Sequence, residues 1–178
     1  MNAIYSKVNF QQPNQQCQFT DLVDDLLNHP KVNELNSYSQ HLNTSRFQHS
    51  LNVAYYSFLF SKRLKTNTEE TVRAALLHDF FLYNWRSEQP VAGSHFDVHP
   101  KQALINAKTV TTITPLMEDV ILSHMWPLGS QKPKSKEAWI VILADKVSTM
   151  MELTHQLTVR SKRWAFSPIM IRLILFMG

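Results

Sequence analysis

Glycine and cysteine are scarce in this sequence. Its 178 residues include only three glycines, at positions 93, 129 and 178. Neither a G-x-G-x-x-G motif nor a P-loop can be formed, because both need clustered glycines for close approach of the backbone to phosphate. Cys17 is the single cysteine, which excludes an internal disulfide and a cysteine-based zinc site and is typical of a reducing cytoplasm.

Signals for β-strands and for membrane insertion are also weak. The sequence has no Asn-Gly or Asp-Gly pair, the strongest short-range signals of a β-hairpin. The apolar run over residues 169–177 is shorter than the roughly 20 residues that a transmembrane helix needs. The polar residues 1–16 lack the apolar core of a signal peptide. We therefore expect an all-α cytoplasmic protein with no transmembrane segment.

The composition is that of a globular protein with a small positive charge. Hydrophobic residues make up 44% of the chain, and the formal net charge is +4. A chain of this length can bury one core as a single domain. This small positive charge favours a small anionic ligand, but it is lower than the charge that is typical of nucleic-acid-binding proteins.

Helical patterns follow one another along the chain. We expect residues 1–18 to form a flexible leader, residues 19–160 a single-domain helical bundle, and residues 161–178 an apolar helical tail. Thr20 is expected to cap the first helix, and Pro100 and Pro115 to lie in the first turns of two later helices. Helices are predicted over residues 19–28, 31–40, 44–65, 66–78, 100–109, 114–125 and 135–157.

The apolar tail allows more than one interpretation. We expect it to pack on the core or on a second subunit, as in a homodimer. A basic patch at Arg160, Lys162 and Arg163 precedes the apolar run 169–177, so an anchor at a membrane surface is the alternative.

Histidine and aspartate recur at the ends and on the apolar faces of the predicted helices. The apolar run 74–77 ends in His78-Asp79. A buried carboxylate needs a partner or a cation, and helix packing can bring such groups to one point. A divalent metal would satisfy both an imidazole nitrogen and a carboxylate oxygen. The other donors are His49, His99, His124 and Asp145, with His95 as an alternative to His99. His78, His99 and His124 could instead be ordinary helix-terminal residues.

The order of these donors resembles that of the HD domain superfamily of metal-dependent phosphohydrolases. The resemblance covers about residues 45–154 and implies an all-α, single-domain helical bundle of the HD-domain type. The aromatic segment 80–85 is similar to that of bacterial members of unassigned substrate. The matching contexts are Arg46-Phe47-Gln48-His49-Ser50, Leu76-Leu77-His78-Asp79 and Leu143-Ala144-Asp145-Lys146.

The resemblance also implies which residues form the site. The ligands of a first metal would be His49, His78, Asp79 and Asp145. A second metal would be bound by His99 and His124, with Asp79 as the bridge. The expected cofactor is one or two divalent ions of manganese, iron, zinc, cobalt or magnesium, which activate a water for attack on a phosphate ester.

Two cations are candidates for contact with the phosphate. Arg46 lies one helical turn before His49 and is expected to bind the phosphate through two hydrogen bonds. Lys146, next to Asp145, is the second candidate. Asp79, Arg46 and Lys146 are thus the expected catalytic residues, although either cation could instead be an ordinary surface or ion-paired charge.

The implied activity is hydrolysis of a nucleotide or of another phosphate monoester or diester. The sequence lacks the Gly-Tyr-Pro signature of the cyclic dinucleotide phosphodiesterases, which argues against that subclass. No general acid is evident beside the predicted ligands. A catalytically silent nucleotide-binding or sensing module is therefore the alternative function.

Overall fold

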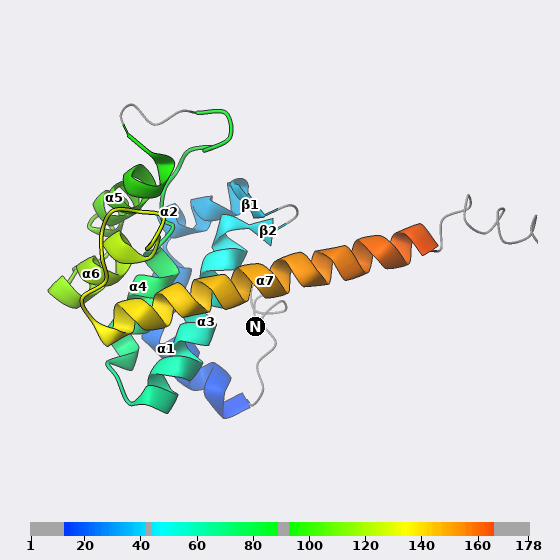
Figure 1. The fold of residues 1–178 in the computed structure, drawn as a ribbon. Helices are drawn as coiled ribbons and strands as arrows, with labels where there is room; N and C mark the ends of the chain where they lie inside the picture. The colour runs from blue at the N-terminus through cyan, green and yellow to red at the C-terminus, as the bar shows by residue number, and fades with distance from the viewer. Residues whose placement is uncertain (1–12, 42–43, 89–92, 166–178) are drawn as a thin grey trace, which may run out of the picture.

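The computed structural model describes residues 13–41, 44–88 and 93–165, with side chains as far as residue 154 in the last helix. The fold is all-α, as predicted (Figure 1). A short 3-10 helix, η2 (Glu34–Ser37), precedes a two-stranded antiparallel sheet of β1 (Ser39–His41) and β2 (Thr44–Ser45). The α-helices are α1 (Pro13–Leu27), α2 (Pro30–Asn33), α3 (Arg46–Leu64), α4 (Thr68–Leu77), α5 (His95–Ala107), α6 (Pro115–Ser123) and α7 (Lys136–Ala165).

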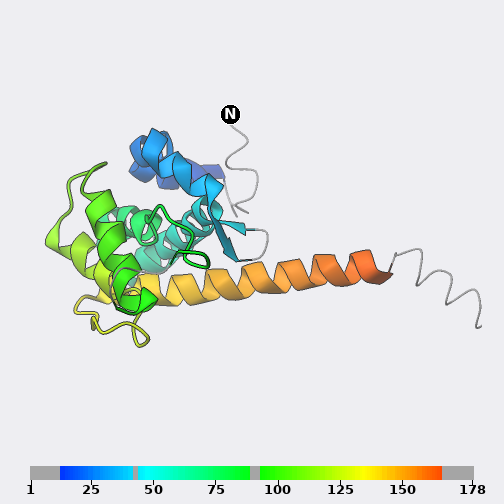
Figure 2. The same cartoon turned by 90° about the horizontal axis from the view of Figure 1, so that it is seen from above.

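Helices α3, α4 and α7 form the centre of the bundle. The most extensive contacts join α3 to α4 and α3 to α7. Helix α7 passes along α3 and then continues beyond the other helices, as Figures 1 and 2 show. The core between these helices consists of fully buried apolar side chains, among them Leu51, Phe58, Leu76, Leu77 and Val141.

Three helix starts follow from side-chain caps. The side-chain oxygens of Ser45, Asn67 and Thr114 accept hydrogen bonds from backbone N–H groups in the first turns of α3, α4 and α6, at 3.2 Å in each case. Such caps satisfy donors that have no partner within the helix. Pro115 takes the first position of α6. The predicted starts of α4 and α6 are therefore confirmed.

The first and last helices are longer than predicted. Helix α1 begins at Pro13, inside the segment 1–18 that was expected to be a flexible leader. Thr20 lies within this helix and donates to the carbonyl of Gln16 at 2.8 Å, so its predicted capping role is wrong. Helix α7 continues to Ala165, past the boundary predicted at residue 160. The predicted tail lies outside the described residues from position 166 onward.

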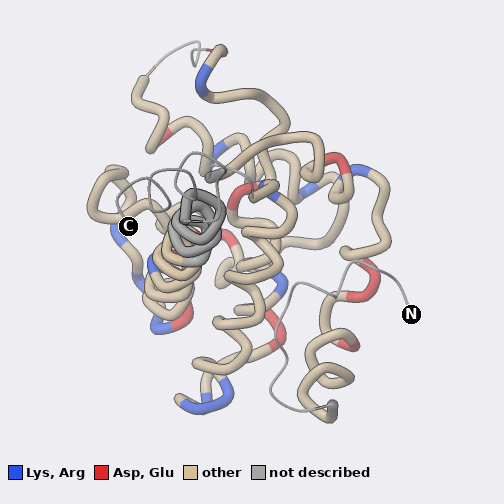
Figure 3. The backbone as a smooth tube through the Cα atoms, turned by 90° about the vertical axis from the view of Figure 1, so that its right-hand side faces the viewer, with Lys and Arg blue, Asp and Glu red and all other residues tan. Residues whose placement is uncertain are grey.

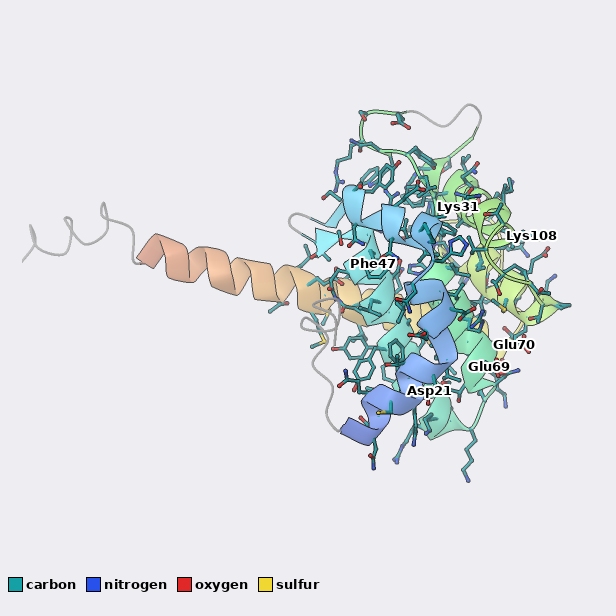
Figure 4. All side chains as sticks on the ribbon, turned by 180° about the vertical axis from the view of Figure 1, so that it is seen from behind. Asp21, Lys31, Phe47, Glu69, Glu70 and Lys108 are labelled. Carbon is teal, nitrogen blue, oxygen red and sulfur yellow. The ribbon has the colours of Figure 1, made fainter. Side chains whose placement is uncertain are left out.

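Helix α1 packs on the core through buried apolar side chains, and one arginine also joins it to α4. Arg73 donates to the two carboxylate oxygens of Asp25 at 2.8 and 2.7 Å and to the carbonyl of Leu22 at 2.9 Å. Figure 4 shows this side of the molecule, where Glu69 and Glu70 lie in the first turn of α4, beside α1. The ion pair thus fixes a helix that forms one wall of the core.

Two other predictions were wrong in detail. The predicted helix 31–40 is only the short α2 and η2, followed by β1. Helix α5 begins at His95 rather than at Pro100, because Ser94 caps it by accepting from the N–H of Phe96 at 3.3 Å. Pro100 therefore lies inside the helix, and His99 lies in its second turn.

Charged side chains are spread over the described surface. Figure 3 shows basic and acidic positions scattered along the backbone rather than gathered on separate sides. Within the described part of the chain, none of the helices has both the length and the apolar character needed to cross a membrane.

Candidate metal centre

Five elements bring histidine and aspartate side chains into the interior. His78 and His124 follow directly after α4 and α6, as their C-cap residues. Because each helix ends at its histidine, the histidine side chain can point inward, beside the core. All six predicted donors are buried, with exposed fractions of at most 8%: His49, His78, Asp79, His99, His124 and Asp145.

Asp79 is shared by two groups of three donors. His49, His78 and Asp79 form one group, and Asp79, His99 and His124 form the other; within each, the donor atoms lie within 4.8 Å of one another. The Asp79 oxygen Oδ1 is 3.3 Å from Nε2 of His99 and 3.4 Å from Nε2 of His124. The oxygen Oδ2 is 3.5 Å from Nε2 of His78. The carboxylate therefore faces three imidazoles.

The hydrogen bonds of these imidazoles determine which nitrogen faces the centre. In His78, His99 and His124, Nδ1 lies 2.7–2.8 Å from a backbone carbonyl three or four residues earlier. A carbonyl only accepts hydrogen bonds, so Nδ1 carries the proton and a neutral ring presents the lone pair of Nε2. Burial lowers the pKa of His78 to about 4, which keeps this ring neutral at pH 7.

The inward lone pairs fit a cation. The Nε2 atoms of His99 and His124 are only 2.9 Å apart, and two lone pairs at this distance repel unless a proton or a metal lies between them. The buried Nε2 of His78 has no hydrogen-bond partner. Buried polar atoms without partners are rare in native proteins. Neutral imidazoles beside an anionic carboxylate are, however, the donor set that divalent transition metals prefer.

His49 lies between two carboxylates of α7. Its Nε2 is 3.1 Å from Oδ1 of Asp145, and its Nδ1 is 3.2 Å from both oxygens of Glu152. Burial lowers the pKa of His49, but hydrogen bonds to Asp145 and Glu152 outweigh it and raise this pKa to about 10. Burial alone would raise the pKa of Asp145. The hydrogen bond from His49 and the positive charge of His49 nevertheless hold the pKa of Asp145 below its usual value.

Glu152 was not among the residues predicted from the sequence. It is buried and accepts a hydrogen bond from Nδ2 of Asn52 at 2.8 Å. Glu152 follows Asp145 by seven residues, which places both on one face of α7. This seven-residue spacing was the sequence signal from which Glu152 could have been predicted as a residue of the site. A carboxylate behind a metal-binding histidine fixes the orientation of its ring and makes it a better donor.

Arg46 does not lie on the surface. It is fully buried, and its guanidinium donates to the carbonyl oxygens of Phe81 and Tyr83 and stacks 3.5 Å from the centre of the Phe81 ring. Its Nε donates to Gln40 at 3.1 Å, and the amide of Gln40 donates to Oδ2 of Asp79. Arg46 therefore reaches the centre through Gln40, a residue of β1 for which the sequence offered no signal. Its predicted contact with phosphate stays a prediction.

Lys146 and His95 border the centre. The side chain of Lys146 is half-exposed, with Nζ 2.8 Å from Oδ2 of Asp145; its role toward phosphate also stays a prediction. The His95 ring stacks on those of His99 and Trp85 and belongs to neither group of donors around Asp79. The structure thus brings His99, and not the alternative His95, to the carboxylate.

Helical fold and buried donors together define an all-α protein with histidine–aspartate groups suited to a divalent metal. A family model, the HD domain, matches residues 46–150. Since this range covers more than half of the chain and includes all six donors, the protein belongs to the HD domain family. Comparisons with curated proteins and with solved structures find no match. Metal-dependent phosphohydrolase activity is typical of this family.

Proposed function

We propose that this protein is a metal-dependent phosphohydrolase that acts on a nucleotide or another phosphate ester. The observation that supports this most is the single carboxylate, Asp79, shared by two buried groups of three donors. Divalent ions bound there would supply a hydroxide at neutral pH and positive charge beside the phosphoryl oxygens. The mixed nitrogen and oxygen donors suit manganese, iron, zinc, cobalt or magnesium.

The residues of the centre have separate roles in this proposal. The first ion would be held by His49, His78, Asp79 and Asp145, and the second by Asp79, His99 and His124. Glu152 orients the ring of His49, and backbone carbonyls orient the other three rings. Lys146 would offset negative charge at the open side of Asp145, since its amino group is half-exposed.

Hydrolysis measured on a panel of substrates tests this function. Protein stripped with a chelator and supplied with Mn²⁺ should release phosphate from at least one nucleotide or phosphodiester. Asp79→Asn should lose this activity by a factor of 10³ or more (order of magnitude) because both ions lose their shared ligand. Asp21→Asn is a matched control, since Asp21 is exposed on α1, on the side shown in Figure 4. Equal activity of the two variants would refute the proposal.

A nucleotide-binding module without turnover is the second candidate. It is favoured by one observation, namely that the cations nearest to the centre already have partners: Lys146 pairs with Asp145, and Arg46 with carbonyl oxygens. Neither is therefore an evident general acid. Saturable nucleotide binding to the Mn²⁺-loaded protein, without product after several hours, would support this candidate over the enzyme.

A further inference from the structure

A cavity of about 500 Å³ lies beside the metal centre. Its size is within the range of small-molecule sites. None of its lining residues is a metal donor, so the site described above does not account for it. The lining comes from η2, β1, the first residue of α3 and the loop after α4, and consists of Ser37, Tyr38, Ser39, Arg46, Asn84 and Arg86.

The cavity is lined by two arginines that form no direct ion pair within the described residues. Arg46 and Arg86 both line it, and among the described residues neither guanidinium has a carboxylate oxygen within 4.0 Å. Burial lowers the pKa of Arg46 to about 10, and the nearby charge of Arg86 contributes to this, yet the group stays cationic at pH 7. The Asp79 carboxylate attracts Arg46 whereas Arg86 repels it, so Asp79 offsets part of the positive charge and a bound anion beside Arg86 would offset more of it.

Both guanidinium groups are held in place before any ligand binds. Arg46 is fixed by its stacking on Phe81. Arg86 donates through Nη2 to the carbonyl of Gln40 at 3.1 Å and stacks 4.3 Å from the Trp85 ring. The loop is closed by Asn84, whose side chain accepts from the N–H of Arg86 at 3.1 Å. Arg46 is fully buried and donates to Gln40 and to loop carbonyls, so it would act on a bound phosphate through its charge. The exposed Arg86 presents a guanidinium fork that matches the oxygens of a phosphate and loses little entropy on binding it.

One residue connects the cavity to the metal centre. The side chain of Gln40 contacts Asp79 on one side and Arg46 on the other, and its backbone carbonyl accepts from Arg86. A single amide group therefore separates the arginine cavity from the carboxylate shared by the two donor groups.

We propose that this cavity binds a second phosphate group of the substrate while the phosphate ester to be hydrolysed lies at the metal centre. The inference rests on the proposed function and narrows it to substrates that carry two or more phosphate groups. A nucleoside diphosphate and a molecule phosphorylated at two positions both have this chemistry.

Inorganic phosphate tests the cavity without the metals. Chelator-treated protein is titrated with phosphate and binding is followed by ³¹P NMR. Wild type should bind saturably, and Arg86→Ala should weaken binding at least tenfold. Arg63→Ala, at an exposed position near the end of α3, should bind as the wild type does. Absence of saturable binding in the wild type, or equal affinities of Arg86→Ala and Arg63→Ala, would overturn the proposal.

Hydrolysis by the Mn²⁺-loaded protein gives an independent second readout. The ratio of kcat/KM for a nucleoside diphosphate to that for the matching monophosphate should fall at least tenfold in Arg86→Ala. An equal loss for both substrates would contradict a site for the second phosphate. If the wild type hydrolyses no compound of the nucleotide and phosphodiester panel, the proposed function fails, whereas the phosphate titration still decides whether the cavity binds this anion.

Discussion

Replacement of Glu152 by glutamine should weaken metal binding while leaving the fold intact. Both carboxylate oxygens lie 3.2 Å from Nδ1 of His49, and Asn52 donates to one of them at 2.8 Å. Glutamine has the same size but removes the charge that makes the imidazole a stronger donor. Loss of such an outer carboxylate typically weakens metal affinity about 10–100-fold, or about 1.4–2.7 kcal/mol. Since the amide oxygen can still accept from Nδ1, we expect a value near tenfold.

Competition with a fluorescent chelator measures this effect. Mn²⁺ is titrated at pH 7.5 into stripped wild type, Glu152→Gln and the matched control Glu137→Gln, which lies on the same helix and accepts from the N–H of Asn67 rather than from a ligand. Urea unfolding of each stripped protein checks that the variants remain folded. Equal Mn²⁺ affinities of Glu152→Gln and Glu137→Gln would refute the orienting role of this carboxylate.

Three further predictions concern protons and packing. Metal binding at pH 7.5 should release about one proton from His49, whose pKa is about 10 before the metal binds. Calorimetry in two buffers of different ionisation enthalpy measures the number of protons released. Identical heats of binding in the two buffers would contradict the release of a proton. Because the pKa of His49 is raised from 6.5, its contribution to the stability of the stripped protein is complete below pH 6.5 and is lost as the pH rises toward 10. Urea midpoints of wild type relative to His49→Gln should therefore fall over this range, and a constant difference would count against the ion pair. Gly129→Ala places a Cβ 2.9 Å from the carbonyl oxygen of Phe96 in the first turn of α5. The substitution should therefore lower the free energy of unfolding in urea by about 1–3 kcal/mol. An unchanged free energy of unfolding would show that α5 can shift to accommodate the added methyl group.

Local signals were enough to locate much of the bundle. Asn67 and Thr114 cap helices where the sequence predicted them, because capping needs only residues a few positions apart. His78 and His124 could be predicted as donors because each ends an apolar helical run and matches the donor order of the HD domain resemblance. The six-residue pattern could therefore be recognised in the sequence. The structure brings five of its members into two groups around Asp79, and Asp145 contacts His49 of the first group.

Features that depend on distant contacts could not be predicted. Pro100 suits a first helical turn, but α5 begins earlier, where Ser94 provides a cap and the N–H of Ser130 donates to Asp97 at 2.7 Å. Gln40 lies in a short strand that exists only because β2 pairs with it, so its link to Asp79 has no local signature. Arg46 was predicted to contact phosphate, with an ordinary surface charge as the alternative, and its burial under the loop that contains Tyr83 could not be predicted from its own position.

Anomalous diffraction from crystals grown with Mn²⁺ tests the central claim most directly. The account predicts two manganese peaks, one on each side of Asp79, the first beside His49 and His78 and the second beside His99 and His124. Both peaks should be absent from Asp79→Asn crystals grown under the same conditions. A wild-type map without a peak among these side chains would contradict the account.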